Sequence, residues 1–251
     1  MTKSELKYFA SLLQKKHRDD EKKFIAEGKK IVSEGIESKF NCELIIATNE
    51  FAAENKLFLS EAESKKIRIE LINNHDFKKI SDTVTPQGIA AVFHKPEKNH
   101  SLKLKSKIAA AVDEISDPGN VGTILRNCDW FGITEILLSK NSADVYNPKT
   151  IRGSMGSIFH LNIFEEVDLT ILLNKLKKDG CKIICADLKG KNLFEYKPEE
   201  KSIIIFSNEA KGPSSEIINL ADEIITIPKY GNAESLNVAS ASAVILAHLV
   251  K

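Results

Sequence analysis

The sequence has 251 residues, of which 42% are hydrophobic and 28% are charged, and its net charge is +1. This composition excludes a disordered chain, and the length fits one large domain or two small ones. No apolar run approaches the roughly 18 residues of a membrane span, and the first residues lack the apolar core of a signal peptide.

The first half is typical of a small α/β unit. The pattern predicts a helix over 4–16, a short apolar run at 24–26, a helix to about Ser38, and strands at 43–48 and 89–94. The polar segment 95–107 contains five lysines and is the best linker candidate. We therefore expect a first domain over 1–98 and a second over 107–251.

The second half alternates short apolar runs with helical patterns. Strands are predicted at 108–112, 135–138, 160–164, 181–185, 202–206 and 223–227, and helices include 168–178 and 215–221. This alternation indicates a parallel sheet covered on both faces. A last helix over 236–250 is apolar on nearly every face, which is typical of a buried helix or a subunit contact.

The distribution of charge and the positions of the cysteines indicate the kind of partner and the cellular compartment. Residues 1–105 carry 20 Lys+Arg against 16 Asp+Glu, and residues 106–251 carry 16 against 19. A basic front half would suit a polyanion partner, although an ordinary solvated surface explains the difference as well. The four cysteines are scattered without a CxxC pair, so we expect no disulfide framework, no metal site and a reduced, cytoplasmic compartment.

Three loops that follow predicted strands could carry chemistry, because ligands bind at the carboxyl ends of parallel strands. In the first, Pro118-Gly119 predicts a turn that holds Asn120, and a helix from Gly122 places Arg126 one to two turns inside. A helix start suits anions and arginine suits phosphate. Taken alone, this loop is better explained by a turn and a surface arginine.

The other two loops have similarly simple alternatives. After the strand at 202–206, Ser207 begins a polar loop in which Ser214 could serve as a helix cap. After the strand at 223–227, Ser235 and Asn237 lie near a helix start, where Ser235 could be an N-cap.

Other enzyme classes lack their motifs. No GxGxxG follows a strand, which argues against a dinucleotide-binding oxidoreductase, and the phosphate-binding GxxxxGK[ST] is absent. The sequence at 153–156 is not GxSxG, and no histidine has a triad setting, so a hydrolase is also excluded. Cys181 and Cys185 are expected to be core thiols.

Four ordered segments carry a resemblance: DPGNVGTILRNCDWFG, NPKTIRGSMGSIFHLNI, IIIFSNEAKGPS and IPKYGNAESLNVASASAVI. Over residues 108–250 they resemble the SpoU (TrmH-like) family of RNA ribose 2′-O-methyltransferases. The front half resembles the ribosomal-protein-like RNA-binding domain of many members, through FIAEG at 24–28 and PQGIAAV at 86–92.

The resemblance implies an α/β catalytic domain with a deep trefoil knot that binds S-adenosyl-L-methionine, and a homodimer formed through the last helix. It also implies an RNA substrate, and the two-domain layout favours 23S ribosomal RNA. A transfer RNA substrate, or a non-catalytic RNA-binding or ribosome-assembly protein that keeps the fold, are the alternatives.

By position in the motifs, the resemblance implies the following site residues. The catalytic set is Asn120, Arg126, Glu209, Ser235 and Asn237, and the cofactor-binding set is Ser207, Gly212, Ile227, Leu236 and Asn237. Ser207 stands where glycine is common, and a serine would be strained if that backbone required a positive φ.

Arg126 has a chemical role that follows from its pKa. A guanidinium with a pKa above about 12 is a poor base, so we expect Arg126 to clamp a substrate phosphate and to stabilise the developing alkoxide. With Arg126, the RNA-contacting candidates are Lys15, Lys16 and Arg18, which belong to the densest basic cluster near the N-terminus. Acidic residues at 19–21 dilute this cluster, so a solvated helix end explains it equally well.

Overall fold

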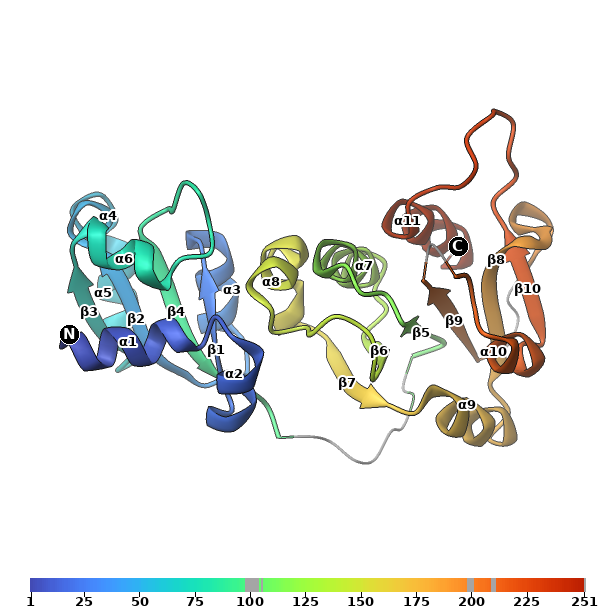
Figure 1. Cartoon of the computed structure of the whole chain (residues 1–251), viewed down its shortest axis with the longest axis horizontal. Coiled ribbons are helices and arrows are strands. Elements are labelled where there is room, and N and C mark those ends of the chain that lie inside the picture. Colours follow the sequence, from blue (N-terminus) through green and yellow to red (C-terminus); the bar gives the residue numbers. More distant parts are fainter. Residues whose placement is uncertain (98–103, 105, 198–200, 209–210, 251) are drawn as a thin grey trace. The chain divides into compact units, whose positions relative to one another are not determined.

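The structure is a computed structural model that describes residues 1–97, 104, 106–197, 201–208 and 211–250. The chain divides into two compact units, shown in Figure 1. The first comprises Met1–Glu97 with Asp144–Phe159, and the second comprises Lys98–Ala143 with His160–Lys251. The inserted segment Asp144–Phe159 thus packs with the first unit, although it lies within the range expected for the second domain. Most of the expected linker 95–107 lies outside the described residues.

The first unit is built on a mixed four-stranded sheet of order β1-β4-β2-β3. β4 runs antiparallel to β1 and β2, and β2 is parallel to β3. Its elements are α1 (Lys3–Ser11), α2 (Lys15–Glu21), β1 (Lys23–Glu27), α3 (Lys29–Glu37), β2 (Cys42–Thr48), α4 (Asn49–Glu54), α5 (Lys56–Ser64), β3 (Arg68–Ile72), α6 (Asn74–Ile80), β4 (Ile89–His94), α8 (Pro148–Ser154) and the 3-10 turn η1 (Ser157–Phe159). The strands predicted at 43–48 and 89–94 are confirmed.

The single helix predicted over 4–16 is wrong, because the chain forms α1 and α2 with a break between them. The Arg18 guanidinium donates hydrogen bonds to the carbonyls of Leu12 (2.9 Å) and Leu13 (2.7 Å). In a continuous helix those carbonyls would accept from the backbone N–H groups four residues later. A side chain therefore satisfies the end of one helix and fixes the break.

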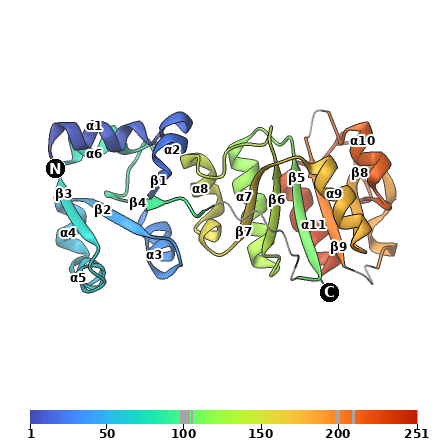
Figure 2. The same cartoon turned by 90° about the horizontal axis from the view of Figure 1, so that it is seen from below.

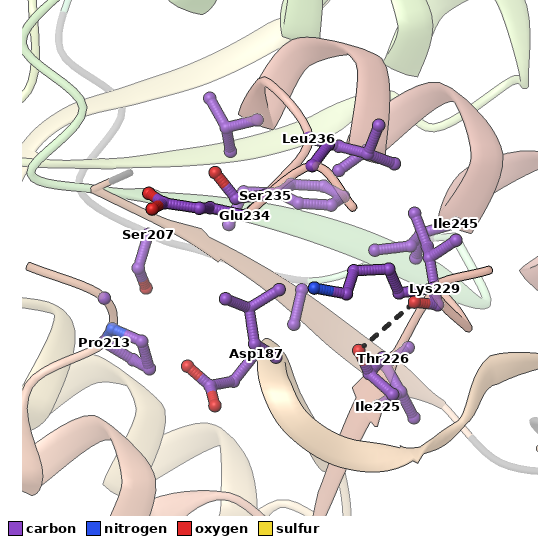
Figure 3. A pocket seen from close by; sticks show the side chains of 18 of the residues that line it. Asp187, Ser207, Pro213, Ile225, Thr226, Lys229, Glu234, Ser235, Leu236 and Ile245 are labelled. Atoms are coloured by element: carbon purple, nitrogen blue, oxygen red, sulfur yellow. Dashed lines mark hydrogen bonds between the residues drawn. The ribbon is translucent and has the colours of Figure 1, made fainter. Parts of the chain in front are cut away.

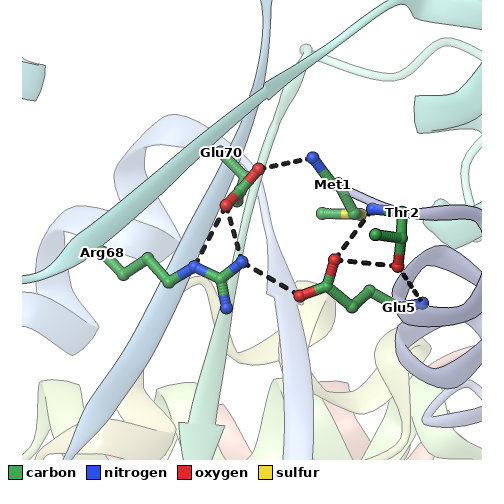
Figure 4. Close-up of polar contacts among 5 residues, drawn as sticks. All are labelled: Met1, Thr2, Glu5, Arg68 and Glu70. Carbon is green, nitrogen blue, oxygen red and sulfur yellow. Dashed lines mark hydrogen bonds and ion pairs between the residues drawn. The ribbon is translucent and has the colours of Figure 1, made fainter.

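The start of α1 is held by a polar network, drawn in Figure 4. Thr2 and Glu5 form a capping box, in which the Glu5 carboxylate accepts from Thr2 and the Thr2 hydroxyl accepts from the Glu5 N–H. Arg68 joins Glu5 (3.0 Å) to Glu70, and Glu70 also accepts from the amino group of Met1 (2.7 Å). The backbone bond from Thr2, with help from Arg68, lowers the pKa of Glu5 to about 2.

Both faces of the first sheet are covered, as the period-2 alternation of strand side chains requires. Ile25 and Val92 pack with residues of α1 and α6 on one face. On the other face, Phe24 stacks with Phe93 at 5.7 Å, and the inserted segment adds Tyr146 (4.6 Å from Phe24) and Phe159 (4.9 Å from Phe93). The inserted segment is therefore part of this aromatic core.

The second unit contains a six-stranded sheet of order β10-β8-β9-β5-β6-β7, and every pair in it is parallel. Its elements are β5 (Ile108–Asp113), α7 (Pro118–Trp130), β6 (Glu135–Ser139), β7 (Asn162–Val167), α9 (Leu169–Lys178), β8 (Lys182–Asn192), the 3-10 turn η2 (Leu193–Glu195), β9 (Ser202–Ser207), α10 (Ser215–Leu220), β10 (Glu223–Thr226) and α11 (Val238–Leu249). Six predicted strands are thus present, but the one predicted at 160–164 begins at Asn162.

Helices cover this sheet on both faces, as predicted (Figure 2). Leu173 of α9 and Ile217 of α10 belong to one core cluster with Ile183, Ile203 and Ile205 of the strands. α11 packs against α7 and β9. No helix in the described ranges is long and apolar enough to cross a membrane.

The cysteines are free thiols. Cys128, Cys181 and Cys185 are buried, which confirms the prediction of core thiols for the last two. Burial raises the pKa of Cys185 to about 12, so this thiol stays protonated at neutral pH.

Candidate active site

Helix α7 begins four residues earlier than predicted, at Pro118 instead of Gly122. The Asp117 carboxylate accepts a hydrogen bond from the Asn120 N–H (2.9 Å), and Pro118 occupies the first helical position, where it is favoured. Asn120 therefore lies in the first helical turn and not on a preceding turn. Arg126 lies about two turns further along the same helix.

Two predicted catalytic residues that are 117 positions apart meet directly. The Asn237 side-chain amide donates to Asn120 Oδ1 at 3.0 Å. Asn237 Oδ1 also accepts from the N–H of Ala239 (2.9 Å), so Asn237 is the N-cap of α11. The alternative that Ser235 caps this helix is therefore wrong. The bond fixes the beginning of α11 against the beginning of α7.

Asn127 makes a second contact between these helices, which the sequence analysis missed. Its amide donates to the Ala239 carbonyl and to the Ser242 hydroxyl, both at 2.9 Å. The available signal was a polar residue beside the apolar positions Ile124 and Cys128 of an amphipathic helix. Hydrogen bonds of Asn120 and Asn127, both on α7, therefore hold this helix against α11 and its N-cap.

The loop after β9 is organised by Asn208, a second residue that the sequence analysis missed. Its amide donates to the Glu114 carbonyl (2.9 Å) and its oxygen accepts from the Lys211 N–H (3.1 Å). Gly212 follows with a φ of +68°, a conformation that glycine adopts readily. Ser214 caps α10, as its alternative interpretation predicted. Glu209 lies outside the described residues.

A cavity of about 480 Å³ opens at the carboxyl ends of β9 and β10 and beside the middle of β8 (Figure 3). Apolar side chains, among them Leu188, Ile225 and Ile245, form much of its wall. Its charged lining residues are Asp187, Lys211, Lys229 and Glu234. Apolar walls with a few polar groups are typical of a small-molecule site.

All but one of the predicted cofactor-binding residues line this cavity. They are Ser207, Gly212, Ile227 and Leu236, and the predicted catalytic residue Ser235 lies on the same wall. Asn237 and Asn120 do not line the cavity, although Asn237 directly follows Leu236 in the chain. The structure thus brings most of the predicted site together at one end of the sheet.

Arg126 stands apart from these contacts. It is exposed on α7, and within the described part of the chain its guanidinium has no hydrogen bond or ion pair. No group of three or more His, Cys, Asp or Glu side chains among the described residues could hold a metal ion. The second unit thus offers a cavity, an asparagine pair and, on α7, a cation without a partner among the described residues.

Comparison with known proteins agrees with this geometry. The SpoU rRNA Methylase family matches residues 107–247, and an MRM3-like substrate binding domain matches residues 3–91. The first match alone spans more than half of the chain. The chain belongs to the SpoU rRNA methylase family.

Relatives extend the similarity over the whole chain. A Bacillus subtilis protein, 23S rRNA (guanosine(2553)-2′-O)-methyltransferase RlmP, is 31% identical over 97% of this chain and 95% of its own length. A solved structure of a TrmH-family RNA methyltransferase from Porphyromonas gingivalis is 31% identical, with a TM-score of 0.86 and coverage of 99% of this chain and 97% of that one. The AdoMet complex of AviRb from Streptomyces viridochromogenes shares the fold at 21% identity, with a TM-score of 0.86 and coverage of 99% and 97%.

Ser207 departs from the glycine that is common in SpoU methylases, but its backbone is not strained. It is the last residue of β9, pairs with Asp113 of β5, and is not among the residues with positive φ. The strain considered from the sequence is therefore absent. Its side chain is only 7% exposed, and its hydroxyl has no hydrogen-bond partner in the described chain.

Arg18 requires a correction as an RNA-contacting candidate. It is 1% exposed, and in addition to its two carbonyl contacts it pairs with Asp144 of the inserted segment at 2.6 Å. A buried guanidinium with all of these partners is not available to a polyanion. Lys15 and Lys16, by contrast, are exposed on α2.

Proposed function

We propose that this protein methylates a ribose 2′-hydroxyl of RNA, with S-adenosyl-L-methionine as the methyl donor. The observation that carries the proposal is the Asn120–Asn237 hydrogen bond, because it joins the helix that bears Arg126 to the loop that lines the cavity. The name of the B. subtilis relative, matched along 97% of this chain, favours 23S ribosomal RNA over transfer RNA.

The cavity fits the methyl donor. Its volume of about 480 Å³ lies in the range of roughly 300–1,000 Å³ that is usual for sites of such ligands. Ile225, Leu236 and Ile245 offer apolar surface to an adenine ring. The buried hydroxyl of Ser207, which has no partner in the described residues, is a polar group that a ligand could satisfy. When bound, the donor supplies an activated methyl group, so no metal is needed.

Arg126 performs the electrostatic part of the reaction in this proposal. Its guanidinium is exposed and free of protein partners within the described chain, so it can bind a phosphate of the RNA. The same charge stabilises the alkoxide that forms as the 2′-hydroxyl loses its proton. Asn120 fixes the beginning of α7, the helix that bears Arg126, against Asn237, and Ser235 lines the neighbouring cavity. Glu209, which the family resemblance adds to the catalytic set, lies outside the described residues.

The first unit supplies the RNA-binding surface through Lys15 and Lys16. Changing both to glutamate should weaken RNA binding and lower the salt dependence by about one unit of slope per lost phosphate contact. The pair Lys56→Glu and Lys66→Glu, on another part of the same unit, is the matched control. These point variants are preferable to deletion of 1–97, because deletion would uncover Tyr146 and Phe159.

A homodimer through α11 is part of the proposal. Ser240 and Val244 are exposed on one face of this helix, and Leu236, just before its N-cap, is also exposed. On α7, which packs against α11, Trp130 is 81% exposed. We expect the protein to sediment as a dimer and Val244→Glu to sediment as a monomer. A monomeric wild type would contradict this assignment.

Two further features complete the proposal. A deep trefoil knot is supported by the loops that follow β9 and β10, because these two strands are separated by β8 and yet their loops line one cavity. A cytoplasmic setting is supported by the four free thiols, since disulfides are rare in that compartment.

The function is tested by transfer of labelled methyl from S-adenosylmethionine to deproteinised ribosomal and transfer RNA from cells that lack this protein. Alkali-resistant dinucleotides report methylation of the ribose. We expect label in ribosomal RNA. Label only in transfer RNA would contradict the substrate, and cofactor binding without transfer to either RNA or to an assembling ribosomal particle would favour a binding role.

A further inference from the structure

Three buried side-chain polar atoms have no hydrogen-bond partner in the described part of the chain. They are Arg152 Nη1, Ser202 Oγ and Ser207 Oγ. Of the three residues, Ser207 lines the cavity and the other two do not. A buried hydroxyl without a partner is costly, and such groups in native proteins often have a functional reason.

The surroundings of Ser207 indicate where its partner would come from. Figure 3 shows the Ser207 hydroxyl directed toward the space between Pro213 and Asp187. Asp187 Oδ1 accepts from the Lys189 N–H (2.9 Å), and Oδ2 has no partner among the described residues. Gly212, which has no side chain to fill this space, lies beside Asp187 Oδ2. A hydroxyl and a carboxylate oxygen therefore lie on one wall beside a proline ring.

A change of a single side-chain torsion would present the Ser207 hydroxyl to a ligand. Ser207 is at the carboxyl end of β9, where its backbone is held by the ladder with β5. A rotation about the Cα–Cβ bond moves Oγ between staggered positions without moving the strand. The usual glycine of this family lacks such a group, so the contact is a property of this chain's own residue.

We propose that the Ser207 side chain is a cofactor-specificity group that hydrogen-bonds the nucleoside half of S-adenosylmethionine. Ribose hydroxyls and the adenine amine both donate hydrogen bonds, and a serine hydroxyl can accept one while donating to another acceptor. A ribose can share its second hydroxyl with the carboxylate of Asp187. The inference rests on the proposed function, because it assigns a partner within the cavity proposed for the methyl donor.

The test is calorimetric titration of the full-length protein with S-adenosylhomocysteine and with 5′-methylthioadenosine, which has the nucleoside but no amino-acid part. Loss of one hydrogen bond predicts that Ser207→Ala and Ser207→Gly bind both ligands about 3- to 10-fold more weakly than the wild type. The melting temperature of Ser207→Ala without ligand should not fall, because the removed hydroxyl had no partner among the described residues. Ser207→Gly should melt lower, because glycine weakens a strand.

Ser202→Ala is the matched control. Ser202 lies on the same strand, is 1% exposed, and also has a hydroxyl without a partner in the described residues, but it is remote from the cavity lining. We expect it to leave both affinities unchanged. Equal affinities of Ser207→Ala and the wild type would overturn the inference, as would an equal loss in both serine variants.

Two other results separate this inference from the proposed function. A loss confined to S-adenosylhomocysteine would overturn the assignment to the nucleoside. A wild type that binds neither ligand would instead contradict the proposed cofactor site, and the inference with it. A wild type that binds both ligands but methylates no RNA would contradict the proposed function. The affinities of the Ser207 variants would then still test whether Ser207 binds the nucleoside.

Discussion

The two units use arginine in opposite ways. In the first unit, Arg18 is buried, donates to two carbonyls and pairs with Asp144 at 2.6 Å. In the second unit, Arg126 is exposed and has no partner within the described chain. Both residues belong to the RNA-contacting candidates, and the structure separates them. A buried charge that is paired inside the protein stabilises the fold, whereas an exposed charge without a partner in the described chain is available to bind a ligand.

Other polar groups repeat this contrast. The buried Glu27 carboxylate in the first unit accepts from the hydroxyls of Ser81 and Thr83 at 2.7–2.9 Å. In the second unit, Ser207 reaches the cavity with its hydroxyl unsatisfied among the described residues. The Glu27 carboxylate is thus satisfied within the first unit, whereas the Ser207 hydroxyl of the second unit is available to a ligand.

The largest effect is expected from removing one partner of the buried Arg18–Asp144 ion pair of the first unit. Asp144→Ala leaves the Arg18 guanidinium buried without its carboxylate, so we expect a loss of about 3–5 kcal/mol in the free energy of unfolding. Denaturant unfolding measures the loss. Asp82→Ala, which removes the exposed partner of Arg152, is the control and should cost less than about 1 kcal/mol. Similar losses of unfolding free energy in the two variants would show that the buried ion pair contributes no more to stability than the exposed one.

The cavity end of the second sheet depends on a close backbone approach. A Cβ atom added to Gly190 would lie 2.5 Å from the carbonyl carbon of Ile225. Gly190→Ala should therefore shift the β8–β10 pairing, lower stability by about 1–3 kcal/mol and weaken binding of S-adenosylhomocysteine. Gly231→Ala has nothing within 4 Å of the new atom and is the stability control. Unchanged unfolding of Gly190→Ala would disprove the tight approach.

Asn237 has a role in both stability and the site, because it caps α11 and donates a hydrogen bond to Asn120. Asn237→Ala removes the N-cap of α11 and should cost about 1 kcal/mol. Asn237→Asp keeps an acceptor for the cap but loses the amide that donates to Asn120. We expect the aspartate variant to melt above the alanine variant while methyl transfer falls in both. Full activity of Asn237→Asp would show that the bond to Asn120 is dispensable.

The smallest expected effect is the pH response of the first unit. The depressed pKa of Glu5, about 2, means that its contribution is present above its ordinary pKa near 4.5 and is lost as the pH falls toward 2. The melting temperature of the wild type should therefore decline between pH 4.5 and 2 more steeply than that of Glu5→Gln. Parallel curves for the two proteins would remove Glu5 from the acid response.

The parts of the fold with local signals were predictable from the sequence. The runs at 108–112 and 202–206 are continuous apolar segments, and they form the central strands of the parallel sheet. The start of α7 was misplaced because Pro118-Gly119 is typical of a turn, while the cap supplied by Asp117 makes Pro118 the first helical residue. Local patterns thus predict elements better than their boundaries.

Contacts between distant residues had no local signal. The burial of Arg18 depends on Asp144, which lies 126 positions later, and a basic cluster with an acidic neighbour looks exposed in sequence. The Asn120–Asn237 bond spans 117 positions, and the sequence assigned both residues only through the family resemblance. The motif supplied the members of the site, and the structure supplied the contact that joins them.

The most direct test compares Arg18→Ala with Arg126→Ala by three measurements: the melting temperature, the affinity for S-adenosylhomocysteine, and methyl transfer to ribosomal RNA. Arg18→Ala should lower the melting temperature. Arg126→Ala should melt like the wild type and bind the ligand within a few-fold, while methyl transfer falls by at least about 100-fold. If Arg126→Ala instead lost stability and ligand binding together with activity, Arg126 would be a structural residue and the account of the site would be contradicted.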